Sequence, residues 1–129
     1  MKIQLHCIYN LDFSYTRISL NQTEVEFRGI LNYHVKDLEL LKETTKGELE
    51  LDSVNVFLSF QIQRHIDIIL TNINEKDILI QRLVITNRLK MVLRRELSEI
   101  GLEVVDFKRL SLWSHTADHG IATDRGIIK

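Results

Sequence analysis

The stretch EKDILIQRLVITNRLKMVLRRELSEIGLEVVDFKRLSLW, residues 75–113, decides the fold of this chain. Apolar side chains recur in it at spacings of three, four and seven, which places them on one stripe of a helix: Ile78, Ile85, Leu89, Val92, Leu93, Leu97 and Ile100. Gly101 follows where positive φ is needed, and Leu102 can fold back on Leu97. The stretch therefore predicts a long helix that begins near Glu75 or Asp77, a glycine stop and a strand.

The composition is that of one ordinary globular domain. The 129 residues include 17 basic and 18 acidic side chains, for a formal net charge of -1, and 44% are hydrophobic. This balance argues against a dedicated nucleic-acid or anionic-membrane binder, although it allows a local basic patch. The single cysteine, Cys7, excludes an internal disulfide, so a reduced cytoplasmic setting is the default. No apolar run is long enough to span a bilayer, and the alternating N-terminus does not match a signal peptide.

Alternating apolar and polar side chains predict strands before the first helix. The first strand places one alternate set inside: Ile3, Leu5, Cys7 and Tyr9. A turn at residues 10–12 leads to a second strand over residues 13–20. Its phase changes between Tyr15 and Ile18, which predicts a bulge or a loose edge. A turn is expected at residues 21–22.

The next strand, residues 25–35, carries the clearest signal. One face takes Val25, Phe27, Gly29, Leu31, Tyr33 and Val35, and the other is polar apart from Ile30. Such an in-phase run is typical of an antiparallel strand with one face on the core and one in water. Gly29, on the inner face, indicates a bend or the close approach of a helix.

Two further helices are predicted between this strand and the opening stretch. Asp37 caps a short helix over residues 38–44. Asp52 or Ser53 caps a longer helix, which ends at a break over residues 72–74. The apolar stripe of the longer helix is broad, so neighbours are expected to cover much of its circumference.

The last strand changes face midway. Val105 and Phe107 share one side and Leu110 and Leu112 the other, which predicts a bulge or twist near residues 108–109. The polar residues 114–129 predict a flexible tail. Strands, then helices, then a returning strand indicate one α+β domain over residues 1–113. Its expected form is an antiparallel sheet of about four strands packed by two long helices and one short helix.

Two segments resemble the SPFH domain of the stomatin, prohibitin and flotillin superfamily. VEFRGILNYHVKDLELL, residues 25–41, is similar to the family's long strand that leads through an Asp into a short leucine-rich helix. LKMVLRRELSEIGLEVVDFKRLSL, residues 89–112, is similar to its long helix, glycine and closing strand. Through Arg28 and Gly29 the chain looks closest to the soluble bacterial branch known as virion-core-like. The likeness covers about residues 25–112 and includes no catalytic residue.

The resemblance implies a non-catalytic scaffold domain that self-associates or docks on a partner or membrane surface. Membrane-bound relatives carry an apolar anchor before the domain, and many continue into a coiled coil; this sequence has neither, as an excised domain or shortened relative would. We therefore expect no enzyme activity, no cofactor and no metal. The expected partners are further copies or another protein, with peripheral contact to an anionic membrane as an option, in the cytoplasm.

Basic side chains beside the apolar stripe of the long helix form the candidate contact surface: Arg82, Arg88, Lys90, Arg94 and Arg95. One interpretation is contact with anionic lipid head groups or an acidic protein, where each charge contributes about 1 kcal/mol at low salt. The more common alternative is a solvated helix face with intrahelical pairs, such as Glu99 with Arg95. Nucleic acid is disfavoured because no aromatic platform or recognition motif accompanies these charges.

Other reactive side chains have simpler interpretations. His115 and His119 have the spacing of metal ligands on a helix, but their segment has no helical stripe and no third ligand. Cys7 is expected to be a small buried hydrophobe rather than a nucleophile. His6 and His34 lie on polar strand faces and are expected to be solvated.

Two function classes stand beside the scaffold. One is a small ligand-binding domain or enzyme, whose site would be built from residues that are scattered in the sequence. The other is a virion- or phage-type structural subunit that works by self-assembly.

Overall fold

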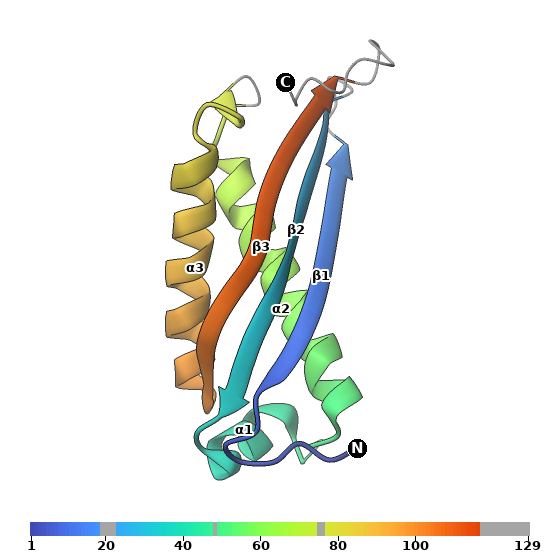
Figure 1. The fold of residues 1–129 in the computed structure, drawn as a ribbon, viewed down its shortest axis with the longest axis vertical. Coiled ribbons are helices and arrows are strands. Elements are labelled where there is room, and N and C mark those ends of the chain that lie inside the picture. Colours follow the sequence, from blue (N-terminus) through green and yellow to red (C-terminus); the bar gives the residue numbers. More distant parts are fainter. Residues whose placement is uncertain (19–22, 48, 75–76, 117–129) are drawn as a thin grey trace.

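The computed structural model describes residues 1–18, 23–47, 49–74 and 77–116. They form an α+β fold in the order β1 (Tyr9–Ile18), β2 (Thr23–Val35), α1 (Leu38–Thr45), α2 (Leu51–Thr71), α3 (Arg82–Glu99) and β3 (Leu102–Thr116). The strands make one antiparallel sheet with β2 in the centre. α2 runs behind the sheet, α3 lies beside β3, and α1 closes one end (Figure 1). The described sheet thus has three strands where the sequence predicts about four.

The N-terminal segment accounts for the missing strand. Ile3 is buried, but Leu5 and Cys7, predicted to lie inside, are exposed. This segment makes only two isolated bridges, from Lys2 to Glu50 and from Leu5 to Val35. His6 has a φ of 67°, which breaks the extended backbone. The alternating pattern is real, but the left-handed backbone at His6 interrupts it, and the segment forms isolated bridges instead of a continuous strand.

The sequence predicts that a strand ends at Tyr9 and that a turn follows at residues 10–12, but in the structure β1 begins at Tyr9 and continues to Ile18. It pairs with β2 from Tyr9–Tyr33 to Ile18–Glu24 without a register shift, so the predicted turn at residues 10–12 is wrong. Of the two alternatives predicted between Tyr15 and Ile18, the bulge does not occur, whereas β1 does lie at an edge of the described sheet. A long, regular partner strand outweighs weak local turn signals, because strand preference depends mainly on cross-strand packing. The turn predicted at residues 21–22 lies outside the described residues.

β2 is the centre of the core, as its alternation predicts. Phe27, Leu31, Tyr33 and Val35 are fully buried between the sheet and the helices. The opposite face carries no helix and is mostly exposed or half-buried. Asn32 is an exception, because it is buried on that polar face and its Oδ1 has no hydrogen-bond partner among the described residues.

A bulge in β3 lies where the sequence predicts one. Arg28 pairs with Ser111 and Ile30 with Lys108, so Gly29 lies opposite two residues, Arg109 and Leu110. A Cβ on Gly29 would come within 2.9 Å of the Phe13 ring and 3.0 Å of the Leu110 side chain. The space that a side chain at position 29 would fill is therefore occupied by side chains of both neighbouring strands, and not by a helix.

A second register shift lies opposite Asn32 and Tyr33, where Val105 is the extra residue. Each bulge resets the phase, so one apolar set faces the helices along all of β3: Leu102, Val104, Phe107, Leu110 and Leu112. Val105 is instead 43% exposed. The predicted sharing of one side by Val105 and Phe107, with the leucines opposite, is therefore wrong.

The helix starts are only partly as predicted. Asp37 caps α1, because its side chain accepts a hydrogen bond from the Leu40 N–H at 3.1 Å. α2 begins at Leu51 with Glu50 at the cap position, before both predicted caps. α3 begins at Arg82 rather than near Glu75 or Asp77, since turns occupy residues 77–81.

Gly101 ends α3 as predicted. Its φ is 94°, and a Cβ there would collide with the carbonyl oxygen of Asp37. The Gly101 carbonyl accepts hydrogen bonds from the Lys36 and Asp37 N–H groups at 2.9 and 3.1 Å. The end of α3 is thereby fastened to the start of α1.

The domain boundary predicted at residue 113 falls inside β3, which continues to Thr116. Residues 117–129, most of the predicted tail, lie outside the described residues. Within the described ranges, no helix is long and apolar enough to cross a bilayer.

Candidate functional site

α3 presents two different faces. The buried face contains most of the predicted apolar stripe and packs on the core: Ile85, Thr86, Leu89, Leu93 and Leu97. Val92, predicted for the same stripe, is only half-buried. The outer face is defined here by the exposed residues Leu83, Val84, Asn87, Arg88, Met91 and Arg95.

Two of the five predicted contact residues are engaged within the molecule. The Arg82 guanidinium lies 5.7 Å from the centroid of the Trp113 ring, a cation–π arrangement. Arg94 Nη1 donates a hydrogen bond to the Val104 carbonyl at 3.3 Å. Both arginines therefore fasten α3 to β3.

The other three predicted residues differ in how far they are available. Arg88 is exposed and makes no hydrogen bond or ion pair with the described residues, whereas Lys90 is half-buried. Arg95 is exposed, and its Nη2 lies 3.9 Å from Glu96 Oε2, beyond hydrogen-bonding distance. The pair with Glu99 that the sequence suggests does not form. Arg88 can therefore be reached without breaking a polar contact, and Arg95 at the cost of one long ion pair only.

Large apolar side chains accompany these cations on the outer face. Leu83 is 74% exposed, Met91 71% and Val84 54%, and Ile80 in the preceding turn is 82% exposed. A shallow hollow of about 660 Å³ lies on α3 beside two of these side chains, lined by Val84, Asn87, Arg88, Met91, Val92 and Arg95. An exposed apolar group rimmed by charge is the usual composition of an interaction surface.

Sequence reasoning missed this apolar group. It followed the stripe that builds the core and assigned the remaining positions to a polar face. The signal was present, because Ile80, Val84 and Met91 recur at spacings of four and seven, one face of a helix. α2 shows the same feature, with Val56, Phe60 and Ile68 exposed, so the cover predicted over much of its circumference leaves this side open.

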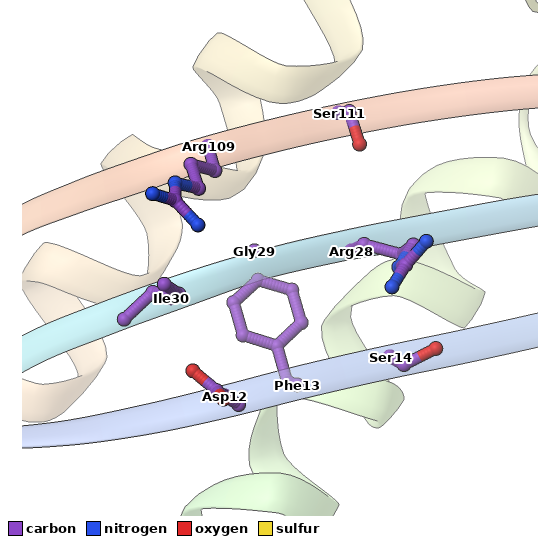
Figure 2. Close-up of a pocket in the computed structure, with 8 residues that line it drawn as sticks. All are labelled: Asp12, Phe13, Ser14, Arg28, Gly29, Ile30, Arg109 and Ser111. Atoms are coloured by element: carbon purple, nitrogen blue, oxygen red, sulfur yellow. The ribbon is translucent and has the colours of Figure 1, made fainter.

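A second hollow, the depression, lies on the open face of the sheet, which is the face that the helices do not cover. It measures about 430 Å³ and is lined by Asp12, Phe13, Ser14, Arg28, Gly29, Ile30, Arg109 and Ser111. Figure 2 shows these residues contributed by all three strands around the bulge. In the strand register, Ser14 faces Arg28 and Arg28 faces Ser111, which makes a row of hydroxyl, guanidinium and hydroxyl across the sheet.

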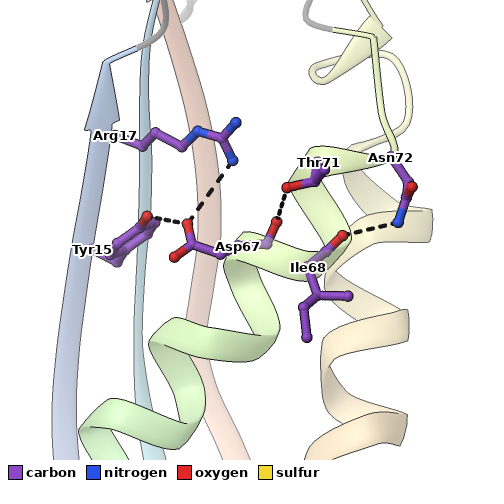
Figure 3. Close-up of polar contacts among 6 residues, drawn as sticks. All are labelled: Tyr15, Arg17, Asp67, Ile68, Thr71 and Asn72. Carbon is purple, nitrogen blue, oxygen red and sulfur yellow. Dashed lines mark hydrogen bonds and ion pairs between the residues drawn. The ribbon is translucent and has the colours of Figure 1, made fainter.

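A polar network joins β1 to α2 (Figure 3). The Tyr15 hydroxyl donates a hydrogen bond to Asp67 Oδ1, and Arg17 Nη1 lies 3.9 Å from the same oxygen. Burial, with the hydrogen bond to Asp67 as the next cause, raises the pKa of Tyr15 to about 12. At neutral pH the Tyr15 hydroxyl is therefore protonated and donates this hydrogen bond.

α2 also carries a buried histidine. His65 Nε2 has no hydrogen-bond partner among the described residues, and Glu96 Oε1 on α3 is 3.9 Å away. Burial is the main cause that lowers the pKa of His65, and the charge of Arg64 adds to it, whereas Glu96 opposes it. The ring is therefore neutral at pH 7, and it fills space in the core.

The remaining candidates do not gather. Cys7 is exposed, contrary to the prediction of a buried hydrophobe, and its Sγ lies 3.9 Å from Gln4 Oε1. His34 Nε2 lies 3.1 Å from Glu103 Oε1 across the strand pair. Among the described residues, no three His, Cys, Asp or Glu side chains come together as metal ligands would. His119 and the side chain of His115 lie outside what the structure describes.

Comparison with known proteins gives no match: neither a scan against protein-family models nor a search of the curated proteins finds a relative of this chain. Two surfaces of the described residues could carry a function: the outer face of α3 and the depression on the sheet.

Proposed function

We propose that this chain is a non-catalytic, SPFH-like scaffold domain that docks through the outer face of α3. The observation that carries the proposal is the combination of Leu83, Val84 and Met91, each more than half exposed, with the exposed cations Arg88 and Arg95. Exposed apolar area favours association, and the cations select an anionic surface.

The energetics favour a docking role in which several copies act together. Burying three such side chains contributes on the order of 5 kcal/mol, which the loss of free motion on association largely offsets. A single contact of this size is weak, whereas several linked contacts multiply in affinity. Self-association and docking on a protein or membrane surface are therefore compatible uses of one face.

The experiment compares four proteins over a concentration series by light scattering and by flotation with vesicles of neutral or anionic lipid, at two salt concentrations. They are the parent, Arg88→Glu with Arg95→Glu, Leu83→Ser with Met91→Ser, and Lys42→Glu. The first double variant spares Arg94, whose bond to Val104 is structural. Lys42, exposed on α1, is the charge-reversal control.

We expect the parent to associate with itself or float with anionic vesicles, both double variants to lose that association at least tenfold, and the control to retain it. Salt should weaken the vesicle contact more than the self-association, since exposed charges are screened. A parent that stays monomeric at high concentration and never floats, or double variants that behave like the parent, would refute the proposal.

A further inference from the structure

The depression on the open face of the sheet has the size and the make-up of a small-molecule site. Its volume of about 430 Å³ falls within the range usual for ligand pockets, about 300–1,000 Å³. It faces away from the helices, so it is separate from the outer face of α3 (Figure 2). None of the residues that line the depression belongs to the outer face of α3.

Arg109 is the first reason to regard this depression as a binding site. Its φ of 54° lies in the left-handed region, where a side chain other than glycine is strained. Glycine is the usual residue at such a bulge position, so an arginine with this φ lowers the stability of the fold. Its guanidinium makes no hydrogen bond or ion pair with the described residues. Strained residues of this kind cluster at ligand-binding sites.

The row Ser14, Arg28 and Ser111 is the second reason. Directly paired residues on one face of a sheet have Cβ atoms about 5 Å apart, so the three side chains can converge on one group. Arg28 Nε forms an ion pair with Glu26 Oε2 at 3.8 Å, which is too long for a hydrogen bond, so the guanidinium N–H groups can still donate to a ligand. The two serine hydroxyls make no hydrogen bond with the described residues.

We propose that this depression binds a small molecule through an anionic phosphate or carboxylate group held by Arg28 and Arg109. Guanidinium groups match both anions, because their N–H donors form a fork with the spacing of the oxygens. Ser14 and Ser111 supply further donors to the remaining oxygens. Asp12, on the rim, bears the opposite charge and accepts a hydrogen bond from a hydroxyl or amino group elsewhere on the ligand. The ligand class is therefore a small acid that also carries a hydrogen-bond donor.

The test follows backbone amide chemical shifts by NMR during titration with inorganic phosphate, sodium acetate, glycerol 3-phosphate, glycerol and sodium chloride at constant ionic strength. The proposal predicts saturable shifts of the amides of residues 28–30 and 109–111 with the phosphate or the acetate, and none with chloride or glycerol. Whichever of the two anions saturates at the lower concentration identifies the preferred group. Glycerol 3-phosphate should bind more tightly than inorganic phosphate, and Asp12→Ala, which removes the acceptor, should abolish that advantage.

The decisive variant is Arg109→Gly, which deletes the guanidinium and suits the backbone. It should melt at or above the temperature of the parent yet bind the anion at least tenfold more weakly. Lys46→Gly is the matched control, because Lys46 is also a cation with positive φ (59°) but lies at the end of α1. It should bind as the parent does. Shifts that appear equally with chloride, that spread over the basic residues of α3, or that survive in Arg109→Gly would overturn the proposal.

Discussion

Two glycines with nearly the same backbone φ have different surroundings. Gly101 has φ of 94° and is packed against the backbone of α1, whereas Gly47 has φ of 93° and nothing within 4 Å of the position a Cβ would take. We predict that Gly101→Ala lowers the free energy of unfolding by about 3 kcal/mol, from strain plus overpacking. Gly47→Ala should cost only about 1 kcal/mol, from strain alone.

Urea denaturation of the two alanine variants measures this difference. Equal losses would mean that the contact of Gly101 with the Asp37 carbonyl does not constrain the fold. The position of Gly101 is one that the sequence predicts well, because a glycine at the end of an apolar stripe has a local cause. Its contact with Asp37 at the start of α1 is not visible in the sequence, because the two residues are far apart along the chain.

His65 makes stability depend on pH. Burial lowers its pKa below the ordinary value of 6.5, so below pH 6.5 the unfolded chain binds a proton that the folded chain resists. The free energy of unfolding should therefore be highest above pH 6.5 and should fall as the pH decreases below it. In His65→Leu part of this slope should vanish. Melting temperatures of both proteins between pH 5 and 8 test this; parallel curves would exclude His65 as the cause.

At the scale of the elements, prediction succeeded where the cause is local. β2 and α1 follow from alternation and from the Asp37 cap, and the bulge near residues 108–109 follows from a change of phase in β3. Prediction failed where pairing with a segment that is distant in the sequence determines the local structure. The N-terminal segment alternates like a strand but makes only two isolated bridges, and β1 runs through a predicted turn because β2 pairs with it throughout.

The two candidate sites were predictable to different extents. The cations of α3 are evident in the sequence, but which of them remain available depends on Trp113 and the Val104 carbonyl in β3. The sheet depression could not be found, because its row of Ser14, Arg28 and Ser111 exists only once three strands are in register. Only the bulge that positions Arg109 had a signal in the sequence.

The link between β1 and α2 leads to a third prediction. Tyr15→Phe removes the hydrogen bond to Asp67 and should lower the free energy of unfolding by about 1 kcal/mol at pH 7. The pKa of Tyr15 is raised to about 12, so its contribution is complete below the unfolded value near 10 and is lost as the pH rises toward 12. The parent should therefore lose more stability than Tyr15→Phe between pH 10 and 11.5.

Thermal melts across that pH range measure the difference, and a cycle with Asp67→Asn isolates the pair. A coupling free energy near zero would show that the two side chains are solvated independently. Tyr33→Phe is a useful comparison, because the Tyr33 hydroxyl donates to Asn55 Oδ1 at 2.6 Å and so joins β2 to the same helix. Burial also raises the pKa of Tyr33, so ionisation of Tyr33 lowers stability at high pH as well. Tyr15→Phe should therefore keep that part of the alkaline loss of stability that comes from Tyr33.

At the scale of the whole molecule, the layers separate the two proposed surfaces. The helices lie on one side of the sheet (Figure 1). The depression opens on the other side (Figure 2), and none of its lining residues belongs to α3. Occupation of one surface therefore does not block the other. A domain docked through α3 would keep its sheet face accessible to a small molecule.

This arrangement gives a prediction for amide hydrogen exchange. β2 is paired on both sides and backed by the core, so its amides should exchange most slowly, whereas alternate amides of the edge strand β1 face away from β2 and should exchange faster. On raising the protein concentration, we expect added protection on α3 if copies associate through its outer face. Protection that appears instead on β1 would show that association extends the sheet at its open edge, and the docking proposal would then be wrong about the surface.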